Sequence, residues 1–176
     1  KIEFFDAALR HYPSLDKVVL ERFDFIDIVS LAERDEFFKP LSWKVLTGFS
    51  RKTFRDAKDH SVYLLNPGAG FAYNVEPFGL LWAMFETELD VSGGMDESFS
   101  AGGGVSLGLL KDFMGSMALT ARAIYYGLGD EHRLYEARFS ESFELSRNQS
   151  LRIEVSGEKS FGVNRTEVML GWNLYF

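Results

Sequence analysis

The stretch Gly104-Val105-Ser106-Leu107-Gly108 matches the G-x-S-x-G pattern of a nucleophile elbow, in which a serine attacks an acyl carbon. That chemistry requires a sharp turn from a strand into a helix, followed later in the chain by an acid and a histidine. Here the serine lies inside an alternating stretch with no helical pattern after it, and small residues packing a crowded interior explain the match better. A lipid hydrolase or acyltransferase built on Ser106 and His132 is therefore the less favoured interpretation.

Other site chemistry is sparse in this sequence. There is no cysteine, which excludes thiolate metal sites, disulfides and cysteine nucleophiles within the chain. The histidines His11, His60 and His132 are scattered without metal-ligand spacing, and Gly102-Gly103-Gly104 lacks the Lys-Ser/Thr of a phosphate loop. A net charge of −7 argues against nucleic acid as a partner. We therefore expect no catalytic site, no metal and no cofactor in this chain.

The elements that must position any site are strands. Strand-like segments recur along the chain between short clusters of turn residues, and no stretch approaches the roughly 18 apolar residues of a spanning helix. The 176 residues suit a single domain, which we predict to be an all-β, antiparallel, up-and-down barrel of about ten strands, with eight to twelve possible. The expected strands are 1–12, 18–31, 41–53, 61–75, 79–92, 98–110, 115–127, 132–146, 151–159 and 164–176.

Apolar and polar residues alternate within these segments, which gives each strand one apolar and one polar face. Leu119 and Ala121, for example, oppose Thr120 and Arg122. In a soluble barrel the apolar face points inward, whereas in a membrane barrel it points outward to lipid. Alternation alone does not separate these two cases.

Three features favour the membrane barrel. The expected strands are about 12 residues long, which suits a tilted bilayer span better than the usual soluble strand of about 5 to 6. Small residues lie on the polar face of 98–110, as a crowded lumen requires, and the 17 Phe, 7 Tyr and 3 Trp are enough for interfacial girdles. The polar faces then supply these candidate lumen charges: Glu86, Glu88, Arg122, Glu136, Arg138, Arg152, Glu154, Arg165 and Glu167.

A narrow lumen would be filled by such charges, whereas a wide pore would leave them solvated. Buried charges must pair, because an unpaired one costs several kcal/mol. We favour a plugged barrel held by ion pairs over a small-solute transport pore.

The chain ends on an alternating stretch in which Val168, Leu170, Trp172, Leu174 and Phe176 are apolar. Its Gly171-x-x-Leu174-x-Phe176 arrangement resembles the C-terminal assembly signal of bacterial outer-membrane β-barrels, although Met169 stands where that signal usually has a polar residue. The resemblance implies an outer-membrane location, outer-membrane lipids and the barrel-assembly machinery as partners, and periplasmic termini. The alternative is the edge strand of a soluble sandwich.

With a periplasmic C-terminus and an up-and-down chain, the sides of the connections follow by alternation. Those near 13–17, 54–60, 93–97, 128–131 and 160–163 face outward, and those near 32–40, 76–78, 111–114 and 147–150 face the periplasm. The longest connection, 32–40, therefore lies on the inner side.

A second stretch, Asp24-Phe25-Ile26-Asp27-Ile28-Val29-Ser30-Leu31 with Arg34-Asp35-x-Phe37-Phe38-Lys39-Pro40-Leu41-Ser42-Trp43, carries a family resemblance. It is similar to the C-terminal region of proteobacterial proteins that carry a periplasmic domain of the Lnb (lipoprotein N-acyltransferase B) type. The resemblance implies that this chain is the C-terminal part of a longer protein, whose Cys/His chemistry lies upstream. We expect the barrel to anchor and position a periplasmic domain or partner. The expected docking residues combine aromatic and charged side chains: Arg34, Phe37, Phe38 and Trp43.

Overall fold

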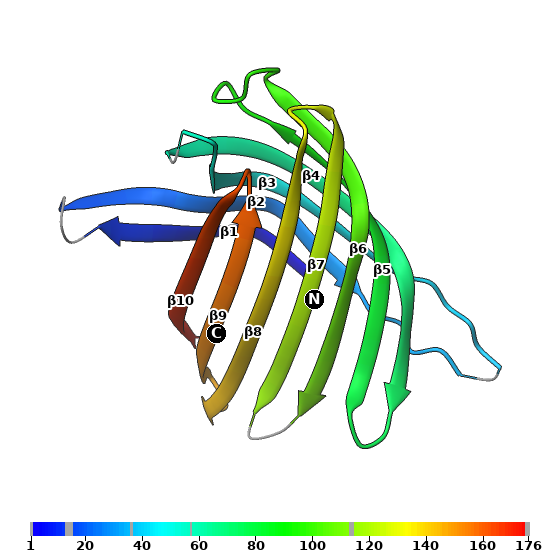
Figure 1. Cartoon of the computed structure of the whole chain (residues 1–176). Helices are drawn as coiled ribbons and strands as arrows, with labels where there is room; N and C mark the ends of the chain where they lie inside the picture. The colour runs from blue at the N-terminus through cyan, green and yellow to red at the C-terminus, as the bar shows by residue number, and fades with distance from the viewer. Residues whose placement is uncertain (1, 13–15, 36, 57, 113–114, 175–176) are drawn as a thin grey trace.

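A computed structural model describes residues 2–12, 16–35, 37–56, 58–112 and 115–174 of the chain (Figure 1). The described residues form no helix, and so none that is long and apolar enough to cross a membrane. The strands are β1 (Ile2–Tyr12), β2 (Lys17–Ser30), β3 (Ser42–Thr53), β4 (Asp59–Val75), β5 (Gly79–Val91), β6 (Phe99–Asp112), β7 (Ser116–Gly129), β8 (His132–Ser146), β9 (Gln149–Ser160) and β10 (Val163–Leu174).

All ten strands belong to one sheet in the order β1 to β10, and each pairs antiparallel with the next along the chain. The predicted all-β, antiparallel, up-and-down arrangement of about ten strands is therefore confirmed. The expected ranges also agree with the observed strands to within a few residues, because period-two alternation marks strands clearly.

Pro67 lies inside β4 and shows how the sheet accommodates a proline. On one side it faces Val45 of β3, but the β4–β5 ladder skips from the pair Leu65↔Leu89 to the pair Gly68↔Glu86. Proline has no N–H to donate to a ladder. The side chain of Asn66 compensates, since its Nδ2 donates to the carbonyl oxygen of Thr87 at 2.8 Å.

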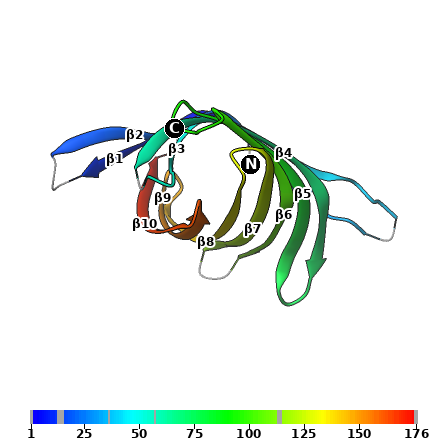
Figure 2. The same cartoon turned by 45° about the horizontal axis from the view of Figure 1, so that its top comes forward.

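The sheet curls, so that β3 to β10 curve around a common interior while the hairpin β1–β2 projects to one side (Figures 1 and 2). Among the described residues β1 and β10 do not pair with each other, so the curl is not closed by a backbone ladder. Gly104 helps β6 to pack closely, because a Cβ there would collide with the carbonyl oxygen of Ala123 on β7.

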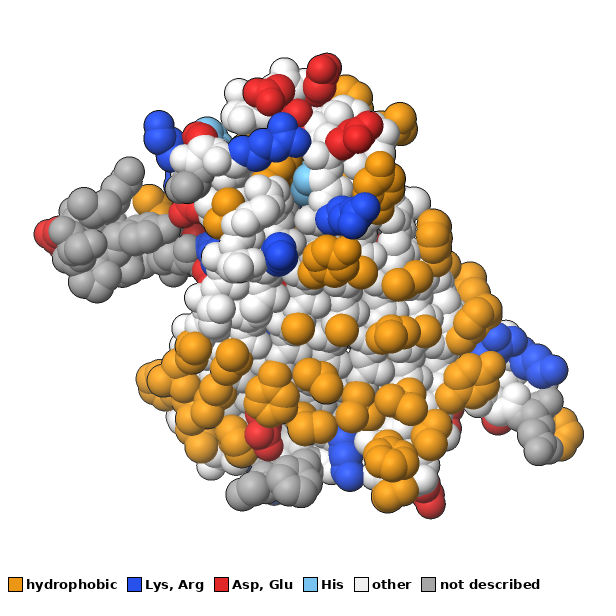
Figure 3. Space-filling model, viewed as in Figure 1, with side chains coloured by type: hydrophobic (Ala, Val, Ile, Leu, Met, Phe, Trp, Pro, Cys, Tyr) orange, Lys and Arg blue, Asp and Glu red, His pale blue; other side chains and the backbone are white. Residues whose placement is uncertain are grey.

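In this sheet charged side chains are buried and apolar side chains are exposed, the reverse of the usual distribution in a soluble protein. On β5 the side chains of Glu86, Glu88 and Asp90 are buried, whereas Phe85 and Val91, which flank this segment, are 62% and 42% exposed. The outer face of β5 to β10 is largely covered by hydrophobic side chains (Figure 3). The concave face is therefore the charged one.

The connections gather at two ends of the curl. Residues 54–56, 58, 92–98, 130–131 and 161–162 meet at one end, which we call the upper rim. There the N–H of Asp96 donates to Asp130 Oδ2 at 2.7 Å, and Arg55 Nη2 donates to the carbonyl oxygen of Glu131 at 2.9 Å. The turns 76–78 and 147–148 and the loop 31–41 lie at the other end.

Candidate functional site

Arg122 on β7 lies at the centre of a charge network on the concave face. Its Nε is 2.7 Å from Glu86 Oε2, its Nη1 is 3.6 Å from Glu136 Oε2, and it also forms an ion pair with Glu88. Glu86 and Glu88 are 0% and 3% exposed. Carboxylates this deeply buried are stable in their charged form only beside a cation, and Arg122 supplies it.

Two lysines of β3 complete this part of the network. Lys44 Nζ lies 2.6 Å from Glu86 Oε1, and Lys52 Nζ lies 2.6 Å from Glu88 Oε1 and 2.7 Å from Asp90 Oδ2. The cations Lys44, Lys52 and Arg122 thus face the carboxylates Glu86, Glu88 and Asp90, three against three. Neither lysine was among the charges expected from the sequence, although both share the parity of Gly48 and Ser50 in β3.

The network continues around the curl on β8 and β9. Arg138 lies 2.7 Å from Glu136 Oε1 through Nη2 and 3.5 Å from Glu154 Oε1 through Nε. Arg152 Nη2 lies 2.8 Å from Glu154 Oε2. The first and last of these pairs each join residues two apart in one strand, and the pair Arg138–Glu154 links β8 to β9.

The remaining two expected lumen charges lie on β10. Arg165 Nη2 is 2.6 Å from Glu167 Oε1 and 2.7 Å from Oε1 of Glu21 on β2. Each of the nine charges selected from the sequence therefore forms at least one ion pair. Within the described part of the chain no group of three or more His, Asp or Glu side chains has the geometry to hold a metal ion.

Ser106 and His132 are far apart in this arrangement. Ser106 lies within β6, buried on the concave face and opposite Arg122, whereas His132 begins β8 opposite Tyr126. Tyr126 in turn faces Gly102, which is four residues from Ser106 along β6, or roughly 13 Å at the rise of a strand. The serine also has no strand-to-helix turn around it, so the elbow geometry is missing at this position.

The ring of His132 has a structural setting at the upper rim. It stacks on Tyr126 at a centroid distance of 4.0 Å and on Phe161 at 3.7 Å, and its Nδ1 donates to the carbonyl oxygen of Asp130 at 2.8 Å. Phe161 also packs edge-on against Phe54 at 5.0 Å. These rings join the β3–β4, β7–β8 and β9–β10 connections into one cluster.

Comparison with known protein families gives a match over nearly the whole chain. The family model described as "Domain of unknown function (DUF7840)" matches residues 1–175. The chain belongs to the DUF7840 family. The searches of curated proteins and of solved structures gave no significant match.

The expected assembly signal of this DUF7840 chain falls on β10. Gly171 pairs with Arg152 of β9, and Leu174 ends the strand opposite Gln149. Phe176 lies outside the described residues. The neighbouring Leu170 and Trp172 are 70% and 63% exposed, so this last strand presents an apolar outer face.

The four residues expected to dock a partner lie on the loop 31–41 of the DUF7840 chain and at the start of β3. Phe37 and Phe38 are 87% and 74% exposed at its tip, where both backbone N–H groups donate to Asp35 Oδ1. The guanidinium of Arg34 lies 4.5 Å from the centre of the Phe71 ring on β4.

Hydrogen bonds also anchor this loop at its base. The N–H of Arg34 donates to the carbonyl oxygen of Ala72 at 2.9 Å, and Ser42 Oγ accepts the N–H of Ala32 at 3.1 Å. Trp43 lies outside the loop, in β3, where it pairs with Ser30 of β2 and Ala69 of β4. The loop thus projects from the sheet (Figure 1), and its two aromatic side chains Phe37 and Phe38 are exposed.

Proposed function

We propose that this DUF7840 chain is an outer-membrane β-barrel domain that anchors and positions a periplasmic domain or partner. The observation that carries the proposal is the inverted polarity of the curled sheet, in which Glu86, Glu88 and Asp90 are buried beside exposed Phe85. A sheet folded in water has the opposite distribution, because burying apolar surface is favourable and burying charge is costly. A sheet folded in a bilayer has this one.

The size of the exposed apolar surface supports the same proposal. Fully burying a side chain such as Leu or Phe is worth about 1.5–3 kcal/mol relative to leaving it in water. Contiguous apolar patches of this extent are rare on soluble monomers and mark contact with lipid or with another protein. The side chains of the outer face that are more than half exposed include Phe85, Val105, Leu107, Tyr125, Leu128, Val168, Leu170 and Trp172.

The orientation in the membrane is part of the proposal. The resemblance of Gly171, Leu174 and Phe176 to an assembly signal supports a periplasmic C-terminus recognised by the barrel-assembly machinery. In an up-and-down sheet the upper rim then faces outward, and the loop 31–41 faces the periplasm.

The anchoring role rests on the loop and on the similarity to proteins with an Lnb-type periplasmic domain. Exposed Phe37 and Phe38 beside Arg34 have the composition of an interface hot spot, with aromatic anchors and a polar surround. The enzyme chemistry of such proteins belongs upstream, so we assign this chain a structural function and no catalytic residues.

The test of the membrane proposal is the environment of single spin labels on β7 and β8. We expect labels at positions 119, 121 and 137 to contact lipid-soluble relaxing agents, and labels at 120 and 138 to be shielded from them. Positions 119, 121 and 137 belong to the exposed parity, whereas 120 and 138 belong to the half-buried one. Labels that report water at 119, 121 and 137 and lipid at 120 and 138 would reject the proposal.

A sealed lumen fits the interior better than a transport pore. At the centre of the interior, inward charges pair with partners on other strands: Lys52 of β3 with Asp90 of β5, and Arg122 of β7 with Glu86 of β5. Such pairs join strands that are not adjacent in the sheet and so occupy the space between them. We therefore propose a lumen plugged by its own side chains.

A further inference from the structure

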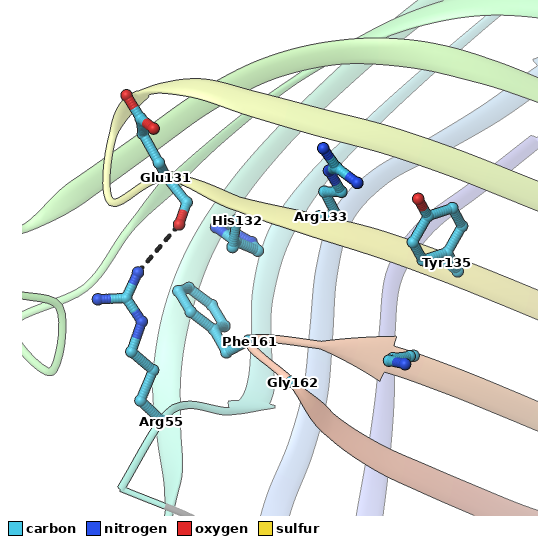
Figure 4. Close-up of a pocket in the computed structure, with 8 residues that line it drawn as sticks. Arg55, Glu131, His132, Arg133, Tyr135, Phe161 and Gly162 are labelled. Atoms are coloured by element: carbon cyan, nitrogen blue, oxygen red, sulfur yellow. Dashed lines mark hydrogen bonds between the residues drawn. The ribbon is translucent and has the colours of Figure 1, made fainter.

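An open-sided cavity of about 490 Å³ lies at the upper rim, beside the aromatic cluster (Figure 4). Its lining includes Arg55, His132, Arg133, Tyr135, Lys159 and Phe161, which come from the β3–β4 connection, from β8 and from the β9–β10 hairpin. Among the described residues, none of these cavity residues forms an ion pair with the charge network of the concave face. The cavity is thus a separate feature of the molecule.

The cavity is cationic although the chain as a whole has a net charge of −7. Arg55, Arg133 and Lys159 contribute three positive charges. Arg133 and Lys159 have no carboxylate partner among the described residues, and Arg133 only approaches the Tyr125 ring at 6.0 Å. The charged groups of the lining therefore favour an anion.

The acidic residues near the cavity do not neutralise it. Glu131 meets Arg55 through its backbone carbonyl oxygen, and its carboxylate points away from the Arg55 guanidinium (Figure 4). Asp96 lies 3.6 Å from Arg55 Nη1, but its side chain is 86% exposed, and an ion pair in solvent is weak. At least two cations remain available to a ligand.

Phe161, which lines the cavity, is held in place by packing against other rings. Phe161 has a φ of 50° in the two-residue turn Phe161-Gly162, a conformation that bulky residues rarely adopt. The stack on His132 and the contact with Phe54 hold its ring there. Arg55 in turn places its guanidinium 5.6 Å from the centre of that ring. Arg55 is therefore positioned against a fixed aromatic surface.

The position of the cations relative to the apolar surface identifies the kind of ligand. Along the outer face of β8, Arg133 is followed by Tyr135, then by Ala137 and Phe139, and Lys159 of β9 lies opposite Tyr135. Several Lys and Arg side chains lie along the upper margin of the hydrophobic area (Figure 3). In a bilayer this level is the headgroup zone, where aromatic residues form the girdle and the lipid phosphates are found.

We propose that Arg55, Arg133 and Lys159 bind the phosphate group of an outer-leaflet lipid in this cavity. The inference rests on the proposed function, because only a membrane-embedded sheet brings this level to a headgroup. Arginine suits the role, since its planar guanidinium donates two parallel hydrogen bonds to a phosphate. The lipid chains would then lie along the apolar face below Tyr135.

The test is native mass spectrometry of the chain refolded into vesicles of phosphatidylcholine with a phosphorylated glucosamine-disaccharide lipid, or with the same lipid after dephosphorylation. We expect the wild-type chain to retain the phosphorylated lipid at least about tenfold better than the dephosphorylated one, given the attraction of each basic residue to anionic lipid. The triple variant Arg55→Gln, Arg133→Gln, Lys159→Gln should lose this preference. The matched control Arg147→Gln removes an exposed cation from the β8–β9 turn at the opposite end and should keep it.

Three other results would overturn the inference. Equal retention of the two lipids by the wild-type chain means that phosphate is not recognised, and retention by the triple variant means that these cations do not recognise it. Equally tight binding of the water-soluble disaccharide phosphate without acyl chains would identify a free phosphate compound as the ligand in place of a lipid. A control distinguishes these results from failure of the membrane proposal. A barrel inserted in the same vesicles changes its electrophoretic mobility on heating, whereas a chain that has not inserted shows no such change in mobility.

Discussion

Arg165 Nη2 on β10 lies 2.7 Å from Glu21 Oε1 on β2, although the two strands share no backbone ladder. The same guanidinium contacts Glu167 at 2.6 Å, and its Nη1 donates to the carbonyl oxygen of Arg51 on β3 at 3.4 Å. One side chain thus ties the last strand of the sheet to two of the first three. Among the described residues this link spans the region that β1 and β10 leave without a ladder.

We predict that Arg165→Gln lowers the free energy of unfolding in lipid by about 1–3 kcal/mol, because Glu21 and Glu167 both lose their ion pair with this guanidinium. Arg165→Lys should cost less, since it keeps the charge and loses only the forked geometry. Urea unfolding in vesicles, followed by tryptophan fluorescence, measures the change. Arg147→Gln, in an exposed turn, is the control. If the urea midpoint of Arg165→Gln is no lower than that of Arg147→Gln, the Arg165 ion pairs contribute nothing to stability.

The paired interior predicts a sealed sheet. We expect little steady single-channel conductance from the purified chain in planar bilayers, because Arg122 and Lys52 occupy the interior together with Glu86, Glu88 and Asp90. Arg122→Ala should introduce leak events, since it removes the central side chain and leaves carboxylates that draw in water. Steady ohmic channels in the wild-type chain, altered by Arg122→Ala, would instead support the transport pore.

Much of this architecture could be predicted from local patterns. Alternation identifies each strand and the face that Arg122 or Glu136 occupies, because neighbouring residues of a strand point to opposite sides. It does not identify partners on other strands. Lys44 and Lys52 share the parity of Gly48 and Ser50 and could have been selected by it, but their contacts with Glu86 and Glu88 depend on how sharply the whole sheet curls.

The upper rim was likewise beyond local reasoning. His132 has no other histidine near it in the sequence, and no neighbouring residue predicts its stack with Phe161, which lies on another hairpin. The same holds for Arg55, whose partner Glu131 is 76 residues away. Contacts of this range depend on the register of every ladder between them, and register is a property of the assembled sheet.

The outer face of β7 offers a paired substitution. Ala121 is exposed on the apolar face, and its neighbour Thr120 is half-buried on the charged face. We predict that Ala121→Arg destabilises the sheet in lipid by about 2–4 kcal/mol, because a charge near the bilayer midplane is costly there. Thr120→Arg should cost less where it finds room among the interior carboxylates. The free energy of unfolding of both variants is measured in vesicles. A larger loss of stability for Thr120→Arg than for Ala121→Arg would argue that the faces are reversed in the membrane.

The loop 31–41 provides the test of anchoring. Phe37 and Phe38 are held outward by the hydrogen bonds of their N–H groups to Asp35, so their rings are presented and not tucked against the sheet. In the full-length protein, we predict that replacing both with Ser leaves a folded, heat-modifiable barrel but loosens the periplasmic domain. A few-fold faster release of that domain by a protease measures the effect, since interface aromatics carry a large share of binding energy.

A matched control separates docking from simple insertion of aromatic rings into the membrane interface. Phe78 is 59% exposed in the turn between β4 and β5, at the same end of the sheet. Phe78→Ser should leave protease release unchanged, because this turn spans only residues 76–78 and its one charge is Glu76, whereas the loop 31–41 is longer and carries Arg34, Asp35 and Lys39. If the Phe37 and Phe38 substitutions leave release unchanged and instead weaken stability in lipid to the same degree as Phe78→Ser, all three rings belong to the interfacial girdle. The loop would then have no part in docking.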